Sequence, residues 1–463
     1  MKPHHDKFTV GTLTYDKRAL YVLFFWLMCN QFTYFLGEEL NGLTRVLMRD
    51  REASYTLMAA LGTVGGLMGM WINPVFSTWS DRFRSPFGRR RPFLLVFAPI
   101  AALTIISIPF APDFYHYLMR FEWAAGILNR MPINGEVLFI GIASIVDGMF
   151  AAVMAAIFSY LYWDVVPENV LGRFNAIGRV VAVASGMAWS FLIIGYAEQH
   201  PKEVYIGVSL VCTAIYVLTL IMVKEGEYPP PEPRQTKSLL EPVLDYAKDC
   251  YSKPYYLWIF AGMLFFQMGN LGNNYVFFYL REDLGMDLGT TGWIQGMGST
   301  VVTLFGVLLG YSAGAWIDRF KPIRVVPLAF FVWSLLALIS FFVVTDKVSA
   351  AVMASLVGIA FFIWGVAAGA VTVQLFPREK LGQFCSAQAF FHQTIIMVLS
   401  PLLVAPFFDW LQFNRGAYLW SSCFYFLAAL VTVKVYFNWK RKQEEASALP
   451  TDENMTRPPA KAY

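Results

Sequence analysis

Hydrophobic residues in this chain gather in long, nearly uninterrupted runs, and polar residues gather in the stretches between them. A run of 18 or more apolar residues is long enough to cross about 30 Å of hydrocarbon as an α-helix. Such runs predict twelve helices, at Leu20–Gly42, Ser54–Thr78, Phe93–Ala111, Val137–Trp163, Asn175–Ala197, Val204–Val223, Tyr255–Leu280, Thr290–Ile317, Val325–Thr345, Ser349–Phe376, Phe384–Phe408 and Ala417–Phe437. The first run is too long for a signal-peptide core and lacks a small-residue cleavage site after it, so we expect it to be retained.

The composition is that of a membrane protein, with 57% hydrophobic residues, 15% charged residues and a positive mean hydropathy. About a quarter of the residues of a soluble globular protein are charged, so that class is excluded. With the N-terminus placed inside, Lys and Arg are concentrated in the cytoplasmic connections, in agreement with the positive-inside rule. We therefore predict an all-α membrane protein with twelve transmembrane helices and both termini cytoplasmic.

Two short motifs recur in the same order in the two halves of the chain. The sequence WSDRFRSP at Trp79–Pro86 returns as WIDRFKP at Trp316–Pro322, 237 residues later. The frame Pro-x-x-x-Leu-Gly-x-Phe begins at Pro167 and again at Pro377, 210 residues later. The two offsets differ because the long loop at Pro112–Glu136 has no counterpart in the second half. This repetition predicts two pseudo-symmetric six-helix bundles.

The hydrophobic runs also set the expected segments of the chain. These are a cytoplasmic N-terminal tail at 1–19, a six-helix bundle at 20–223, a cytoplasmic linker at 224–253, a second six-helix bundle at 254–438 and a disordered cytoplasmic tail at 439–463. Within the linker, Ser238 begins an apolar periodicity typical of an amphipathic helix on the inner membrane surface. A plain tether between the bundles is the equal alternative.

A basic loop lies between the second and third predicted helices. It reads SDRFRSPFGRRRPF at Ser80–Phe93 and sets its arginines between two apolar segments. The duplicated twelve-helix plan, with Asp-Arg motifs after helices two and eight, resembles the major facilitator superfamily. More narrowly, SDRFRSPFGRRRPFLL resembles the signature of the sucrose-transporter and glycoside–cation symporter groups. The resemblance implies two halves that rock about a site near the membrane midplane.

The resemblance further implies that this loop belongs to a gate on the cytoplasmic side. Arg and Asp at helix ends form charge-assisted hydrogen bonds with neighbouring helix ends. Asp164 ends the fourth predicted helix at the same face, and we expect it to be the partner of the arginines. The candidate gate residues are Asp81, Arg82, Gly88, Arg89, Arg90, Arg91, Asp164, Arg173, Asp318, Arg319 and Arg378. The alternative is a loop that only orients the protein in the membrane.

Two charged residues lie deep inside predicted helices, where an ionisable side chain is costly and usually functional. Asp147 is the only deep carboxylate in a predicted helix, and Arg179 is the only deep arginine. The resemblance implies that Asp147 accepts a proton, and a buried salt bridge between two helices is the alternative. At 1.5 Å per residue, Asp147 lies about 30 Å and Arg179 about 18 Å from the turn near Pro167. Straight helices would keep them apart, and Glu38 and Glu39 share the depth of Asp147.

Polar and aromatic residues within the predicted helices suit a ligand with many hydroxyl groups, because amides both donate and accept hydrogen bonds. The resemblance implies that the first and seventh helices line the cavity. The candidate substrate-binding residues are Asn30, Gln31, Tyr34, Gln267, Asn270, Asn274, Trp293, Trp364, His392 and Gln393. The aromatic members would stack on sugar rings, with lipid contact or packing as their alternative. For His392, packing and proton relay are equal alternatives.

Other features restrict the chemistry. The stretch WINPVF lacks the carboxylate that glycoside–cation symporters carry there to hold sodium, which favours a proton as the coupling ion. Phosphate-binding loops, His-Glu-x-x-His and Cys pairs at metal spacing are missing from the sequence, so we expect neither an enzyme nor a metal site. The five cysteines are scattered and predict no disulfide framework. We expect no cofactor, with a proton gradient as the driving force.

We therefore predict a secondary active transporter with alternating access that carries a sugar, glycoside or oligosaccharide together with a proton. One alternative is an uncoupled facilitator or exporter of another small organic solute. Another is a non-transporting accessory membrane protein on the same scaffold. Gate motifs in both halves favour transport, because a static scaffold has no need of them. We expect a multi-pass monomer in the lipid bilayer of the inner or plasma membrane that binds a small molecule and no nucleic acid.

Overall fold

The computed structural model describes residues 8–227, 248–377 and 381–447, and most of these residues are helical. A hairpin of β1 (Phe8–Val10) and β2 (Leu13–Tyr15) comes first. It is followed by α1 (Lys17–Arg49), α2 (Tyr55–Arg82), α3 (Arg91–Leu118), α4 (Glu122–Leu128), α5 (Gly135–Val165), α6 (Glu168–Ala188), η1 (Trp189–Ile193), α7 (Ile194–Ala197) and α8 (Pro201–Met222). The start predicted for the linker helix, Ser238, lies outside the described residues.

The helices after the linker are α10 (Pro254–Phe278), η2 (Tyr279–Asp283), α11 (Leu288–Phe320), α12 (Pro322–Val343), α13 (Lys347–Leu375), α14 (Leu381–Leu399), η4 (Ser400–Val404), α15 (Ala405–Leu411) and α16 (Gly416–Ser447). The segments η1, before the linker, and η2 and η4, after it, are single turns of π-helix. The π-turn η1 joins α6 to α7, and η4 joins α14 to α15. Such turns interrupt the regular hydrogen bonding of a long helix.

Nine helices within the described ranges are long and apolar enough to cross a membrane. They are Lys17–Arg49, Arg91–Leu118, Gly135–Val165, Glu168–Ala197, Pro201–Met222, Pro322–Val343, Lys347–Ala368, Gln383–Leu411 and Gly416–Glu445. A helix satisfies its backbone polar groups internally, as the hydrocarbon of a bilayer requires. The chain is therefore a multi-pass membrane protein, as the sequence predicted. The other three predicted runs fall on α2, α10 and α11.

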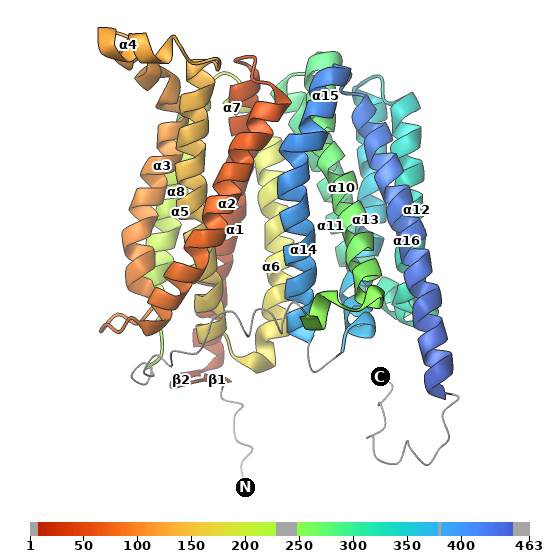
Figure 1. The fold of residues 1–463 in the computed structure, drawn as a ribbon. Helices are drawn as coiled ribbons and strands as arrows, with labels where there is room; N and C mark the ends of the chain where they lie inside the picture. Colours follow the sequence, from red (N-terminus) through yellow and green to blue (C-terminus); the bar gives the residue numbers. More distant parts are fainter. Residues whose placement is uncertain (1–7, 228–247, 378–380, 448–463) are drawn as a thin grey trace. The chain divides into compact units, whose positions relative to one another are not determined.

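The described chain forms two compact units. The first comprises Met1–Gln235, Gly285–Thr303 and Met397–Phe413, so it includes the start of α11 and the segment from η4 through α15. Within this unit α3 packs against α5 and α8, and α1 packs against α6 and α8 (Figure 1). Fully buried aliphatic side chains such as Leu94 and Ile157 form its core.

The second unit comprises Thr236–Leu284, Leu304–Ile396 and Asn414–Tyr463. Within it α10 and α12 both pack against α16, and α12 also packs against α13. Its core is rich in aromatic rings: Phe266 stacks on Phe330 with ring centres 4.9 Å apart. Large aromatic side chains bury much apolar surface, which holds these helices together.

Side-chain caps explain where several helices begin. Asp16 accepts a hydrogen bond from the backbone N–H of Ala19 at 2.7 Å and so starts α1. Ser54 accepts one from Leu57 at 3.1 Å and starts α2. These caps satisfy N–H groups that have no partner within the helix.

Candidate functional site

The basic loop between α2 and α3 is bound by the carboxylate of Asp164, close to the end of α5. Arg89 donates from Nη2 to Oδ1 at 2.7 Å and from Nε to Oδ2 at 3.2 Å. Arg90 donates from Nε to Oδ2 at 2.7 Å and from Nη1 to Ser80 Oγ at 3.1 Å. The Arg90 side chain is only 5% exposed, so solvent screens this cluster weakly. The structure thus joins two arginines of the loop to the partner that the sequence suggested.

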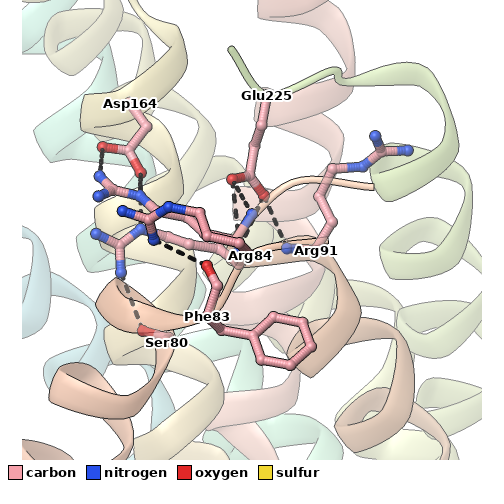
Figure 2. Close-up of polar contacts among 8 residues, drawn as sticks. Ser80, Phe83, Arg84, Arg91, Asp164 and Glu225 are labelled. Atoms are coloured by element: carbon pink, nitrogen blue, oxygen red, sulfur yellow. Dashed lines mark hydrogen bonds and ion pairs between the residues drawn. The ribbon is translucent and has the colours of Figure 1, made fainter. Parts of the chain in front are cut away.

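A second carboxylate, Glu225, binds the backbone of the same loop. It accepts three consecutive N–H groups at 2.9, 3.0 and 2.8 Å, from Arg89, Arg90 and Arg91. Gly88 permits this approach, because its φ is +104° and a Cβ there would lie 2.7 Å from Glu225 Cδ. Figure 2 shows that one carboxylate, Asp164, faces guanidinium groups, whereas Glu225 faces the backbone. Glu225 was not predicted, because it binds backbone N–H groups, which no residue type in the loop indicates.

The structure defines the other candidate gate residues less fully. Arg82 and Arg173 are exposed in the first unit, and Arg319 is exposed in the second. The side chains of Asp81 and Asp318, and all of Arg378, lie outside the described part of the chain. Among the candidate gate residues, the structure therefore defines the contacts of the loop from Gly88 to Arg91 with its two carboxylates.

Asp147 is buried in α5, with 9% of its surface exposed. Its Oδ1 accepts a hydrogen bond from Thr104 Oγ1 of α3 at 3.1 Å. It borders a cavity of about 90 Å³ whose lining comes from α1, α3, α5 and α8. The polar side chains on this cavity are Thr33, Tyr34, Glu38, Asn41, Asp147, Ser209, Cys212, Thr213 and Tyr216. A polar space of this size has room for several water molecules, each of which needs about 10–15 Å³.

Arg179 does not pair with Asp147. Arg179 is exposed on α6, and the described residues contain no ion pair between these two side chains. This result agrees with the separation calculated for straight helices. The charged side chain that shares the cavity of Asp147 is instead a second carboxylate, Glu38.

The polar residues of α1 lie against other helices of the first unit. Asn30 is buried, and its Oδ1 accepts a hydrogen bond from the Tyr162 hydroxyl of α5 at 2.9 Å. Gln31 lies against α6, where a Cβ on Gly178 would be 2.5 Å from Gln31 Oε1. In the described structure, Asn30 Nδ2 and Gln31 Oε1 are buried without a hydrogen-bond partner. Such groups are rare in folded proteins and call for a partner such as water or a ligand.

In the second unit, a series of hydrogen bonds connects the amides of α10 with Tyr425 of α16. The Tyr425 hydroxyl donates to Asn270 Oδ1 at 2.7 Å, and Asn270 Nδ2 donates to Gln267 Oε1 at 2.8 Å. Asn273 Nδ2 donates to the Tyr425 hydroxyl at 3.4 Å. The hydrogen bond of Gln267 with Asn270 thus uses the amide oxygen of Gln267, and an amide can also donate from its nitrogen. Tyr425 and Tyr162 were not predicted, because single tyrosines do not stand out in a chain with 17% aromatic residues.

The two candidate tryptophans differ in their surroundings. Trp364 is half-buried, and its ring centre lies 4.8 Å from that of Phe266 in the aromatic core. It also borders a cavity of about 110 Å³ in the second unit. Trp293 is exposed. Trp293 is the more exposed of the two, but at 37% exposure most of its surface is covered as well.

His392 on α14 is buried, and its Nδ1 donates to the backbone carbonyl of Gln388 at 2.7 Å. In the neutral ring this bond fixes the proton on Nδ1 and leaves Nε2 as an acceptor. Gln393 and Asn274 are exposed. Within the described ranges, no three His, Cys, Asp or Glu side chains are grouped to hold a metal ion.

Comparison with known proteins places this architecture in a family. Residues 19–401 match the model of the Major Facilitator Superfamily. The chain belongs to this superfamily. The matched region includes the basic loop, the Asp147 cavity and the α10 amides, so the candidate sites lie within the shared superfamily region.

Three curated proteins are similar to parts of this superfamily member. The general alpha-glucoside permease of Schizosaccharomyces pombe is 26% identical over 174 residues, which are 36% of this chain and 31% of the permease. Solute carrier family 45 member 3 of Mus musculus is 23% identical over 197 residues, which are 40% and 33% of the two chains. Sucrose transport protein SUC3 of Arabidopsis thaliana is 32% identical over 65 residues, which are 14% and 11%. The chain thus spans about a third or less of the length of these relatives.

Solved structures share the fold over most of the chain. A mutant of the nucleoside transporter NupG matches with a TM-score of 0.65 at 10% identity, covering 89% of this chain and all of that one. A D-xylose-proton symporter matches with a TM-score of 0.58 at 14% identity, covering 90% and 96% of the two chains. These likenesses show the major facilitator fold.

Proposed function

We propose that this protein is a secondary active transporter, and not an enzyme, that moves a sugar or glycoside together with a proton by alternating access. The observation that carries the proposal is Asp147. It is a buried carboxylate in a hydrophobic helix, with a threonine hydroxyl as its hydrogen-bond partner and no ion pair among the described residues. An unpaired charge at such a place is costly, and carboxylates there usually serve ion or proton movement.

The cavity beside Asp147 supplies a route for the proton. Water molecules in a polar cavity would connect the carboxylate with the neighbouring acid, Glu38, which borders the same space. Binding of a proton at Asp147 removes its charge, so the loaded transporter can reorient without moving an uncompensated ion. We propose no equivalent role for Arg179, because it is exposed and separate from the cavity.

The amides are the proposed sugar contacts. Within the described residues, Asn30 Nδ2 and Gln31 Oε1 are a buried donor and a buried acceptor without partners, and Gln267 lies at the end of the Tyr425 network. Each sugar hydroxyl both donates and accepts, so such groups suit it. The names of relatives also support this class, because they include an alpha-glucoside permease and a sucrose transport protein. Asn270, held by two hydrogen bonds, would position Gln267.

In the same proposal, the basic loop with Asp164 belongs to the cytoplasmic gate. Its described contacts join α2, the start of α3, α5 and the segment after α8 within the first unit. A loop so fixed keeps these helix ends together while the helices that carry them move as one body. We place the protein in the inner or plasma membrane, with bundles at 20–223 and 254–438 as its moving parts.

The test is uptake into proteoliposomes, with radiolabelled sucrose and maltose as probes. The wild type should accumulate at least one probe only when a pH gradient is imposed. Asp147→Asn should lose accumulation at least tenfold yet keep exchange of the probe down its gradient. The matched control is Glu136→Gln, which changes a carboxylate at the start of the same helix, where it pairs with Arg51. We expect this control to accumulate the probe as the wild type does.

Three outcomes would contradict the proposal in different ways. Normal accumulation by Asp147→Asn would remove this residue from the coupling step. Uptake of either probe by the wild type with no response to the pH gradient would favour an uncoupled facilitator. Uptake of neither probe would exclude both as substrates and remove the support drawn from the relatives.

A further inference from the structure

Two helices that begin in the first unit have a carboxylate from another segment of the chain bound to their first N–H group. Both begin at the end of the unit opposite the basic loop. At the start of α2, Asp409 of α15 accepts the N–H of Tyr55 at 2.8 Å, the N–H of Thr56 at 2.8 Å and the Thr56 hydroxyl at 2.6 Å. At the start of α11, Glu198 accepts the N–H of Leu288 at 3.2 Å. Glu198 follows α7 directly.

The two contacts are built in the same way. In each helix a local cap takes the N–H three residues ahead: Ser54 accepts Leu57 at the start of α2, and Asp287 accepts Thr290 at the start of α11. The first N–H of the helix is left for the carboxylate that comes from elsewhere in the chain. An acidic group is favourable there because the N-terminus of a helix carries partial positive charge.

The internal repeat relates the two contacts. Glu198 and Asp409 are 211 residues apart, one more than the offset of the repeat that begins at Pro167. The first residues of α2 and α11 are 233 residues apart, close to the offset of 237 between the Trp79 and Trp316 motifs. In each repeat, therefore, an acidic residue follows the fifth predicted helix, and it binds the start of the second predicted helix of the other repeat.

Close packing continues below each contact. Thr63 of α2 donates from its hydroxyl to the carbonyl of Met397 at 2.9 Å. On the other side, a Cβ on Gly195 would lie 3.2 Å from the Cα of Gly289, and a Cβ on Gly292 would clash with Ile194. Small residues thus let η1 and α7 approach α11 closely. We call the contact of α2 with Met397 and Asp409 the α2 seam, and the contact of α7 with α11 the α11 seam. These two seams account for the inclusion of Gly285–Thr303 and Met397–Phe413 in the first unit.

We propose that Asp409 and Glu198 are a symmetric pair of latches that close one face of the transporter, and that both must leave their helix starts before this face opens. The positive-inside rule assigns this face to the outside of the cell. Asp409 makes three hydrogen bonds and Glu198 makes one, so Asp409 dominates. The inference rests on the proposed transport cycle, but it needs neither a sugar nor a proton gradient for its test.

The test measures how fast a reporter cysteine in the α2 seam reacts with a maleimide. The reporter is Thr63→Cys, at a half-buried position against Met397, in the full chain in nanodiscs that expose both faces. Peptide-resolved mass spectrometry reads this cysteine alone, so the native cysteines stay in place. Asp409→Asn should raise the labelling rate at least about fivefold, since hydrogen bonds to a charged group are the stronger ones. Glu198→Gln should raise it less, and the double variant should exceed Asp409→Asn.

The matched control is Asp346→Asn. This carboxylate also caps a helix, but it accepts N–H groups of its own helix α13, from Val348 and Ser349. Its loss should leave labelling within twofold of wild type. Should Asp409→Asn fail to fold, Thr56→Val keeps the carboxylate and deletes one of its three hydrogen bonds, and a two- to threefold rise is expected.

Unchanged labelling in folded Asp409→Asn and in the double variant would overturn the proposal, as would an equal rise in Asp346→Asn. Unchanged labelling in Thr56→Val would overturn it where Asp409→Asn does not fold. Raised labelling in Asp409→Asn together with normal proton-coupled uptake would still support the latch proposal. Normal accumulation by Asp147→Asn in the uptake test would refute the coupling role of Asp147 and leave the latches standing.

Discussion

Asp164→Ala should destabilise the first unit strongly, because it removes the common acceptor of two arginines. Three hydrogen bonds are lost, two from Arg89 and one from Arg90. The carboxylate is 14% exposed, and the Arg89 and Arg90 side chains are 18% and 5% exposed. Removing one partner of a buried ion pair costs about 3–5 kcal/mol of stability. Because this cluster is partly exposed, we expect a loss of about 3 kcal/mol.

The assay is the midpoint of thermal inactivation, measured as the monodisperse fraction that remains after heating in detergent for a fixed time. In domains of 150–250 residues, 1 kcal/mol shifts a midpoint by about 2–4 °C, so the expected drop is about 6–12 °C. Glu444→Ala is the control, because Glu444 and Lys440 form an exposed pair on α16 at 3.6 Å. Exposed pairs contribute little, so this midpoint should move by about 1 °C at most.

A drop of less than about 2 °C in Asp164→Ala would refute the reasoning. A double-mutant cycle with Arg89→Ala supplies an independent check. If the two side chains interact as the distances indicate, the double variant loses less stability than the two single variants together. Additive losses would mean that the Arg89–Asp164 contact contributes nothing measurable.

Two further predictions use the same heating assay. Gly88→Ala should lower the midpoint, because its φ of +104° is strained for Ala and a Cβ would lie 2.7 Å from the carboxylate carbon of Glu225. The control is Gly207→Ala in α8, where a Cβ meets no atom within 4 Å, and it should not lower the midpoint. The pKa of Asp346 lies below its usual range because the backbone N–H groups of Ser349 and Val348 donate to it. Its contribution to stability is therefore complete above the unfolded pKa of about 3.9 and is lost as the pH falls through the lower folded value. Asp346→Asn should remove this part of the pH dependence, and a midpoint profile identical to wild type would contradict it.

The membrane fold could be predicted from the sequence because hydrocarbon imposes it. An apolar run long enough to span the membrane must satisfy its own backbone polar groups, which favours a helix. The repeated motifs divide the chain into two halves. The partner of the basic loop could also be predicted. Asp164 ends a hydrophobic run at the same face as Arg89 and Arg90. Opposite charges at one membrane face attract each other, and the attraction is stronger where water does not surround them.

Contacts to the backbone could not be predicted in this way. Glu225 binds N–H groups, and every residue except proline has one, so no residue type in the loop indicates its acceptor. The same holds for Asp409 at Tyr55 and Thr56. The Tyr425 network depends on how α16 packs on α10, which hydrophobic periodicity does not determine.

These backbone contacts suggest how the chain distinguishes fixed joints from movable ones. Ser54 and Asp346 cap helices to which they are adjacent in sequence, so these caps persist in every conformation that keeps the helix. Asp409 and Glu198 reach their N–H groups from distant parts of the chain, so each contact exists only while two segments are together. Without these partners, the starts of α2 and α11 still have their local caps, Ser54 and Asp287, and water can satisfy the remaining N–H groups at a membrane surface. The cost of separation is therefore moderate, as the proposed latch requires of a contact that forms and breaks in each cycle.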